Sequence, residues 1–138
     1  MIPAEIQRIV RAGVPLAGQW GIEVLQAEAG TALCRLPERP DLLRPGGTIS
    51  GPALMGLADV AMWAALLGVH EGRDESLTSQ LAITFLRRPA PGAVLAEARI
   101  VKRGGRLIYG EVWLRAEGET EPAAHVTTQW VAVTPPRQ

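Results

Sequence analysis

The pattern of apolar and polar residues predicts two helices, one at the N-terminus and one in the middle of the chain. Isoleucine and valine recur at helical spacing within residues 2–10, and Gly13 marks the end of this first helix. Residues 50–68 give the strongest helical pattern, since Ser50 suits an N-cap and Ala, Leu and Met fill the segment. This segment is apolar nearly all round, which predicts burial on most sides.

Six other segments have the pattern of short strands bounded by turn residues. They cover residues 20–27, 31–36, 76–86, 93–102, 106–116 and 123–133. Glycines at 30, 104, 105 and 118 lie between strands, and the proline-rich and glycine-rich residues 37–47 predict a loop. Short turns favour an antiparallel meander of the last four strands. The expected fold is α+β, with one long helix held against a curved antiparallel sheet.

Length and composition indicate a single domain over residues 1–138. Hydrophobic residues make up 47% of the chain and charged residues 20%, which is typical of globular proteins. The 14 basic side chains balance 14 acidic ones, and this argues against general nucleic-acid binding. The N-terminus has no signal-peptide pattern, and Asp59 interrupts the longest apolar run. We therefore expect a cytoplasmic protein with no membrane partner.

The chain offers few residues for metal or disulfide chemistry. Cys34 is the only cysteine, so no internal disulfide or paired-cysteine site can form, and we expect it to be a packed residue. His70 and His125 stand alone in the sequence without neighbouring ligands, so no metal site is expected. No serine lies in a G-x-S-x-G turn, which argues against an α/β-hydrolase triad.

Three stretches carry a resemblance to a known family. Residues 47–51 (GTISG) lead into Leu57-Ala58-Asp59, residues 78–89 read TSQLAITFLRRP, and residues 102–107 read KRGGRL. Their order and spacing resemble the hotdog-fold thioesterases of the phenylacetate-degradation (PaaI-like) type. The resemblance extends from about residue 20 to residue 133 and implies a curved sheet wrapped around one long helix.

The resemblance implies an acyl-CoA thioesterase and assigns roles to individual positions. Asp59 matches the family's catalytic carboxylate, Gly51 matches a backbone N–H that polarises the thioester carbonyl, and Thr78 matches a hydroxyl that orients the attacking water. The chain departs from the family where Ser50 replaces the usual histidine and Arg44 replaces a frequent asparagine. No metal or redox cofactor is implied, and coenzyme A enters only as part of the substrate.

The residues themselves support a similar chemistry, with a structural alternative for each. Burial of the Asp59 carboxylate costs free energy unless it has a partner or takes part in catalysis, so Asp59 is a candidate general base or nucleophile. The alternative is a structural role, in which it bonds a neighbouring backbone group or an arginine. The helix start at Gly51 can stabilise an oxyanion, or it can be a simple cap. Eight residues of helix separate the two by about 12 Å. The simplest solution is a dimer that joins Gly51 of one subunit with Asp59 of the other.

Several further side chains are candidates for binding substrate. Met55, Met62 and Trp63 lie on the helix face of Asp59, with Trp63 the best candidate, although core packing is the ordinary role of such residues. Ser50 and Arg44 are candidates by their place in the motif. Candidates for binding the phosphates of coenzyme A are Arg87, Arg88, Arg103 and Arg106, together with Lys102; solvated strand ends and turns would equally explain them.

The sequence thus predicts hydrolysis of an acyl-CoA, with an aromatic or medium-chain acyl group, to free acid and coenzyme A. One alternative is a non-catalytic domain that binds or senses acyl-CoA, for which Ser50 in place of histidine is the best support. Another is a hotdog-type hydratase or dehydratase, if the fold brings His125 to Asp59. We expect a homo-oligomer, with a dimer as the smallest active unit and a tetramer as the full assembly.

Overall fold

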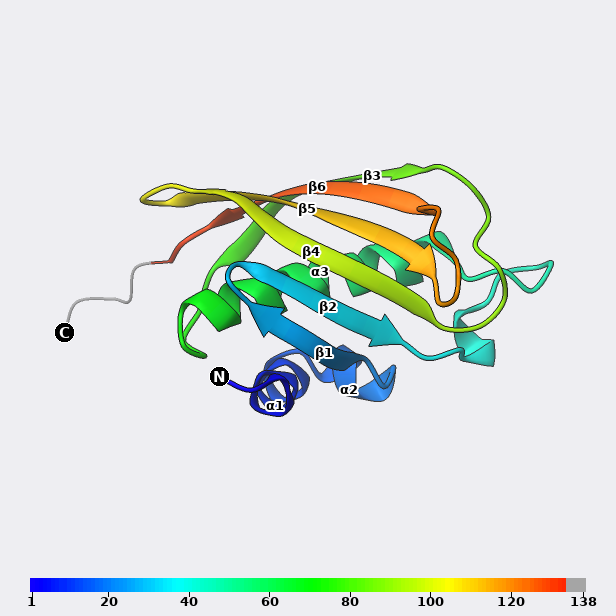
Figure 1. Ribbon diagram of the computed structural model, residues 1–138, viewed down its shortest axis with the longest axis horizontal. Coiled ribbons are helices and arrows are strands. Elements are labelled where there is room, and N and C mark those ends of the chain that lie inside the picture. The colour runs from blue at the N-terminus through cyan, green and yellow to red at the C-terminus, as the bar shows by residue number, and fades with distance from the viewer. Residues whose placement is uncertain (134–138) are drawn as a thin grey trace.

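The computed structural model describes residues 1–133 and consists of one long helix lying against a curved antiparallel sheet (Figure 1). The helices are α1 (Pro3–Gly13), α2 (Pro15–Gln19) and α3 (Gly51–Val69), with a 3-10 turn at Pro40–Leu42. The strands are β1 (Glu23–Glu28), β2 (Thr31–Leu36), β3 (Leu77–Phe85), β4 (Val94–Arg103), β5 (Leu107–Ala116) and β6 (Ala124–Val131). Their order in the sheet is β1-β2-β4-β5-β6-β3.

The α+β layout and most element bounds agree with the predictions from the sequence. Ser50 caps α3, and its hydroxyl accepts a hydrogen bond from the backbone N–H of Ala53 at 3.4 Å. The first strand begins at Glu23, later than predicted, because the short helix α2 occupies part of the preceding segment. A helix of five residues is too short to give a periodic apolar pattern, so the sequence contained no clear signal for it.

The predicted meander of the last four strands is wrong for β3. Strands β4, β5 and β6 do pair in sequence order, but β3 pairs with β6 at the far edge of the sheet. The connection over residues 86–93 carries Pro89 and Pro91, which do not suit a tight hairpin, and it takes the chain across to β4. It begins beside β6, since the backbone N–H groups of Leu86 and Arg87 donate to the carbonyl of Ala123.

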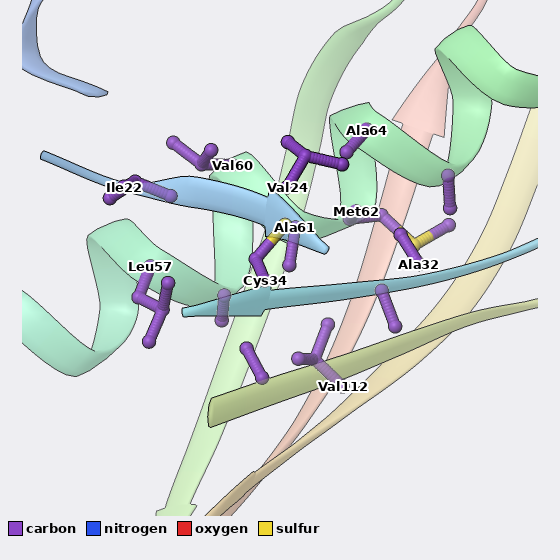
Figure 2. Packing of buried hydrophobic residues seen from close by; sticks show 14 of the residues in the cluster. Ile22, Val24, Ala32, Cys34, Leu57, Val60, Ala61, Met62, Ala64 and Val112 are labelled. Atoms are coloured by element: carbon purple, nitrogen blue, oxygen red, sulfur yellow. The ribbon is translucent and has the colours of Figure 1, made fainter. Parts of the chain in front are cut away.

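Most of α3 is buried against the inner face of the sheet. Figure 2 shows Leu57 and Met62 of the helix among Cys34 of β2 and Val112 of β5, and all four are fully buried. Burial raises the pKa of the Cys34 thiol to about 12, so this cysteine is an unreactive packing residue, as expected. By length and composition α3 passes as a membrane span, but most of it is enclosed within the molecule.

The two edges of the sheet have different surroundings. Helix α1 packs against β1, whereas β3 forms the other edge and is exposed along most of its length (Figure 1). Leu77 and Phe85, at the two ends of β3, are 65% and 55% exposed. An edge strand with apolar side chains and unpaired backbone groups is a ready surface for pairing with another chain.

The close approach of α3 to the sheet depends on Gly110 of β5. A Cβ atom at this position would lie 2.2 Å from Cε of Met62 and 2.9 Å from the backbone oxygen of Arg99. We expect Gly110→Ala to lower the free energy of unfolding by about 1–3 kcal/mol through overpacking. Chemical denaturation should show this loss, whereas Gly105→Ala, where a Cβ meets nothing within 4 Å, should change stability by less than about 0.5 kcal/mol.

Candidate active site

Asp59 is the only charged residue of α3, and it lies where the helix faces the edge strand β3. The hydroxyl of Thr78 donates a hydrogen bond of 2.7 Å to Oδ1 of Asp59. Strand β3 is irregular at this point, since Thr78 is opposite Trp130 and Gln80 is opposite Gln129, which leaves Ser79 as an extra residue. Such a bulge re-aims side chains. The fold thus brings together two of the three residues predicted to be catalytic.

The surroundings of Asp59 favour its neutral form more than water would. Burial raises the pKa of this carboxyl group above its usual value, and the hydrogen bond from Thr78 lowers it in part. No arginine or lysine among residues 1–133 forms an ion pair with it within 4 Å. A carboxylate held in this way is a better proton acceptor than an exposed aspartate.

A cavity of about 460 Å³, which we call the Asp59 cavity, opens beside this pair. Its lining includes Asp59 and Thr78 together with the side chains of Val60, Trp63, Leu77 and Trp130. The walls are therefore largely apolar, and the polar groups among them are the pair of Asp59 and Thr78 together with the side chains of residues 74–76. This combination suits an apolar group carrying a single reactive polar centre.

A second cavity of about 370 Å³, the helix-start cavity, lies at the N-terminus of α3. Gly51, Arg44, Phe85 and the pair Arg87 and Arg88 line it. The backbone N–H of Gly51 and the positive end of the helix dipole favour negative charge here. Pro52 has no N–H group, and the N–H of Ala53 donates to Ser50. Arg87 is also paired with Glu119 and Glu121, at 3.3 and 3.6 Å. The cavity is thus cationic at a helix start, as an anionic ligand or an oxyanion requires.

Gly51 and Asp59 do not share a cavity within one chain. Gly51 lines the helix-start cavity and lies against Phe85, while Asp59 lines the other cavity beside Thr78. Phe85 and Thr78 stand toward opposite ends of β3. The separation predicted from the helical rise therefore holds, and a single chain does not present both groups to one carbonyl carbon.

The remaining predicted binding residues lie in several places. Met55 is 39% exposed and lines neither cavity, and Met62 packs in the core against Gly110. Arg103 and Arg106 belong to the β4–β5 hairpin, which lies at the opposite end of the sheet from the β3–β4 connection (Figure 1). Within one chain these two arginines are not gathered with the arginines at the start of α3.

Neither histidine forms a hydrogen bond with Asp59. The ring of His125 stacks on Trp113, with 3.9 Å between ring centroids, and its Nε2 lies 3.0 Å from Glu111. His70 pairs instead with Asp74 at 2.9 Å. Among residues 1–133 there is no cluster of three or more metal-ligating side chains. The Asp–His pair that a hydratase would need is therefore absent from this chain's Asp59 cavity.

Asp74 lines the Asp59 cavity and has little exposure, and it was not among the site residues predicted from the sequence. Its carboxylate accepts hydrogen bonds from the indole of Trp63 and from both the backbone N–H and the hydroxyl of Ser76. An aspartate two residues before a serine is a common turn signal, and it could have marked this position. Its contact with Trp63 could not be predicted, because it spans eleven positions between two elements.

Comparison with known proteins agrees with this geometry. The profile of the thioesterase superfamily matches residues 46–123, which include the whole of α3 and Thr78. A proposed thioesterase from Silicibacter sp. TM1040 is 31% identical, with 97% of this chain and 93% of that chain covered and a TM-score of 0.86. A variant of the phenylacetic acid degradation protein PaaI from Thermus thermophilus is 26% identical, with 86% and 99% covered and a TM-score of 0.75.

A proposed esterase of Saccharolobus solfataricus is 28% identical over 91 residues. This match covers 66% of the present chain and 64% of that protein, so the chain spans a little under two thirds of that relative's length. The superfamily match covers more than half of the chain, and the topology of its solved relatives is the one described above. The chain therefore belongs to the thioesterase superfamily, with the hotdog fold of its PaaI-like members.

Proposed function

We propose that this protein hydrolyses an acyl-CoA thioester to the free acid and coenzyme A. The observation that carries the proposal is the hydrogen-bonded pair of Asp59 and Thr78 at the wall of a largely apolar cavity. Thioesters combine an apolar acyl group with one electrophilic carbonyl, and this cavity offers largely apolar walls beside the Asp59 carboxylate. An aromatic or medium-chain acyl group fits this lining.

In the proposed reaction, Asp59 accepts a proton from a water molecule as that water attacks the thioester carbonyl. Thr78 donates to Asp59 and helps to place the water. The oxygen that becomes negative is stabilised by the backbone N–H of Gly51 and by the positive end of the α3 dipole. The C–S bond then breaks, and the leaving thiolate of coenzyme A takes up the proton held by Asp59, which restores the carboxylate. Attack by the Asp59 carboxylate itself, through an anhydride, would use the same groups.

The helix-start cavity is the proposed binding region for the charged part of coenzyme A. Arg44, Arg87 and Arg88 line it, and guanidinium groups pair well with phosphate oxygens. Arg103 and Arg106 are too far along the sheet to join them from the same chain, so they would contribute from another subunit. We propose no metal or redox cofactor, no nucleic-acid or membrane partner, and a cytoplasmic location.

We propose a homodimer as the smallest active unit, formed along β3. Gly51 lies beside Phe85 near one end of this edge strand, and Asp59 beside Thr78 near the other. If two copies of β3 pair antiparallel about a twofold axis, the Phe85 end of one strand faces the Thr78 end of its partner. Gly51 of one subunit then approaches Asp59 of the other. A tetramer of two such dimers is the proposed full assembly.

The alternative is a domain that binds acyl-CoA without hydrolysing it. Ser50, in the place of the family's usual histidine, uses its hydroxyl as the cap of α3. It therefore supplies no imidazole to the helix-start cavity. This observation favours a binding module. Activity measurements distinguish a thioesterase from a domain that only binds acyl-CoA.

We expect Asp59→Asn to lower kcat/KM for acyl-CoA hydrolysis by about 10²–10⁴-fold, since the amide has no basic oxygen but still accepts the Thr78 hydrogen bond. The measurement is thiol release with a chromogenic reagent across short, long and aromatic acyl-CoAs. Asp41→Asn is the matched control, because Asp41 is exposed and pairs with Arg39; it should retain wild-type rates. Wild-type protein that binds acyl-CoA without releasing thiol would favour the binding module.

The role of Thr78 can be read from the pH dependence of the rate. Its hydrogen bond stabilises the charged form of Asp59, so Thr78→Val should raise the pKa of Asp59 further and move the acid limb of kcat/KM to higher pH. Thr78→Ser keeps the hydroxyl and should restore the wild-type profile. An acid limb that stays in place in Thr78→Val would mean that another group controls it.

A shared site predicts that two inactive variants rescue each other. In heterodimers of Asp59→Asn with Gly51→Val, one site combines Gly51 of the first chain with Asp59 of the second and is intact. We expect about half of the wild-type activity per heterodimer, because one of two sites survives. Differently tagged chains allow heterodimers to be purified. Heterodimers without activity would show that each site uses Gly51 and Asp59 from the same chain.

A further inference from the structure

Asp74 is a buried carboxylate on the segment between α3 and β3, where it accepts four hydrogen bonds. Its donors are the indole Nε1 of Trp63 at 3.1 Å, the ring Nδ1 of His70 at 2.9 Å, and the backbone N–H and hydroxyl of Ser76 at 3.1 and 2.7 Å. Its side chain is 3% exposed. Nothing in the proposed chemistry uses this residue, and a carboxylate so fully bonded fixes the positions of its partners.

The indole of Trp63 is held at both ends. Its N–H group donates to Asp74, and the far edge of its ring packs on Gly13 of α1, where a Cβ atom would lie 2.7 Å from Cη2 of the ring. This leaves the side chain little room to turn. The ring also lines the Asp59 cavity, so the cavity has a fixed wall at this point.

The distance of this wall from the reacting centre follows from the helix. Trp63 comes four residues after Asp59 on α3, and side chains at this spacing have Cβ atoms about 5–6 Å apart. A chain of several methylene groups that extends past Asp59 in this direction would meet the indole. To continue, it would have to displace the ring, which breaks a hydrogen bond to a buried carboxylate and disturbs the contact with Gly13.

We infer that Trp63 limits the length of the acyl chain that this site accepts, and that Asp74 is the positioning residue that holds Trp63 in place. This inference rests on the proposed thioesterase function and narrows its substrate class, among aromatic and medium-chain acyl groups, to those compact enough to end at the Trp63 ring. Asp74 also binds Ser76, two residues before Thr78, so it could act on the reaction by a second route. An effect through Thr78 would be the same for every substrate, whereas an effect through Trp63 depends on chain length.

The test uses S-alkyl-CoA thioethers, which cannot be hydrolysed, with butyl, octyl and dodecyl chains. Their affinities are measured by calorimetry alongside kcat/KM for the matching acyl-CoAs. We expect wild-type protein to prefer butyl over dodecyl by at least tenfold. Trp63→Ala should abolish this preference, and Asp74→Ala, which removes the side-chain acceptor of the indole N–H, should reduce it at least several-fold. Asp41→Asn should keep it. In the Trp63→Ala background, Asp74→Ala should have no further effect on the ratio.

Trp63→Phe covers the case in which Asp74→Ala does not fold, because it keeps an aromatic ring but cannot donate to Asp74. It should also reduce the preference, and an unchanged ratio in this variant would overturn the anchoring role. If Asp74→Ala lost the same factor for every chain length, Asp74 would be a purely structural residue and the inference would be overturned. Wild-type protein without any length preference or thioether binding would also overturn it. If no acyl-CoA were hydrolysed but the thioether affinities followed the expected ratios, the proposed function would be rejected and the role of Trp63 in binding would stand.

Discussion

The need to bury α3 on nearly all sides governs the rest of this structure. An isolated apolar helix of this length has no stable place in water, so the sheet must curve around it and approach closely. Gly110 of β5 makes room for Met62 of the helix, and Gly56 makes room for the ring of Trp20, whose atoms would lie 2.8 Å from a Cβ there. At both contacts a glycine admits a large side chain, which lets α3 lie close to the sheet at Gly110 and close to the residue that follows α2 at Gly56.

This constraint also decides where a polar group on α3 can lie. Asp59 faces β3, the edge strand, where the enclosure of the helix is weakest and a cavity reaches its side chain. Burial still raises the pKa of Asp59, and only the hydroxyl of Thr78 opposes that shift. A carboxylate without a cationic partner destabilises the folded protein at neutral pH, because its ionised form is less favourable there than in the unfolded chain. The proposed role of Asp59 as a general base would account for a carboxylate at this position of the central helix.

Local features of the fold could be predicted because they depend on nearby residues. The cap at Ser50, the turn at Gly104-Gly105 and the bounds of β2 follow from the residues at those positions. The place of β3 could not be predicted, because strand pairing depends on contacts far apart in sequence. The family resemblance placed Asp59 and Thr78 in one site but did not predict their hydrogen bond, which depends on β3 lying beside α3 at the edge of the sheet. Asp74 was not predicted for the same reason, because its place in the site depends on a hydrogen bond from Trp63, eleven positions away in the sequence.

Strand β3 closes one edge of the sheet and also contacts both regions of the proposed site. Its start presents Thr78 to Asp59, its end presents Phe85 to Gly51, and the segment before it presents Asp74 to Trp63. A strand in the middle of the sheet could not do this, because neighbours on both sides would cover its backbone and exclude a partner. An edge strand leaves one row of N–H and C=O groups unpaired, and a second copy can satisfy them. In the dimer proposed above, the same exposed edge that would be a liability in a monomer is the place where two half-sites meet.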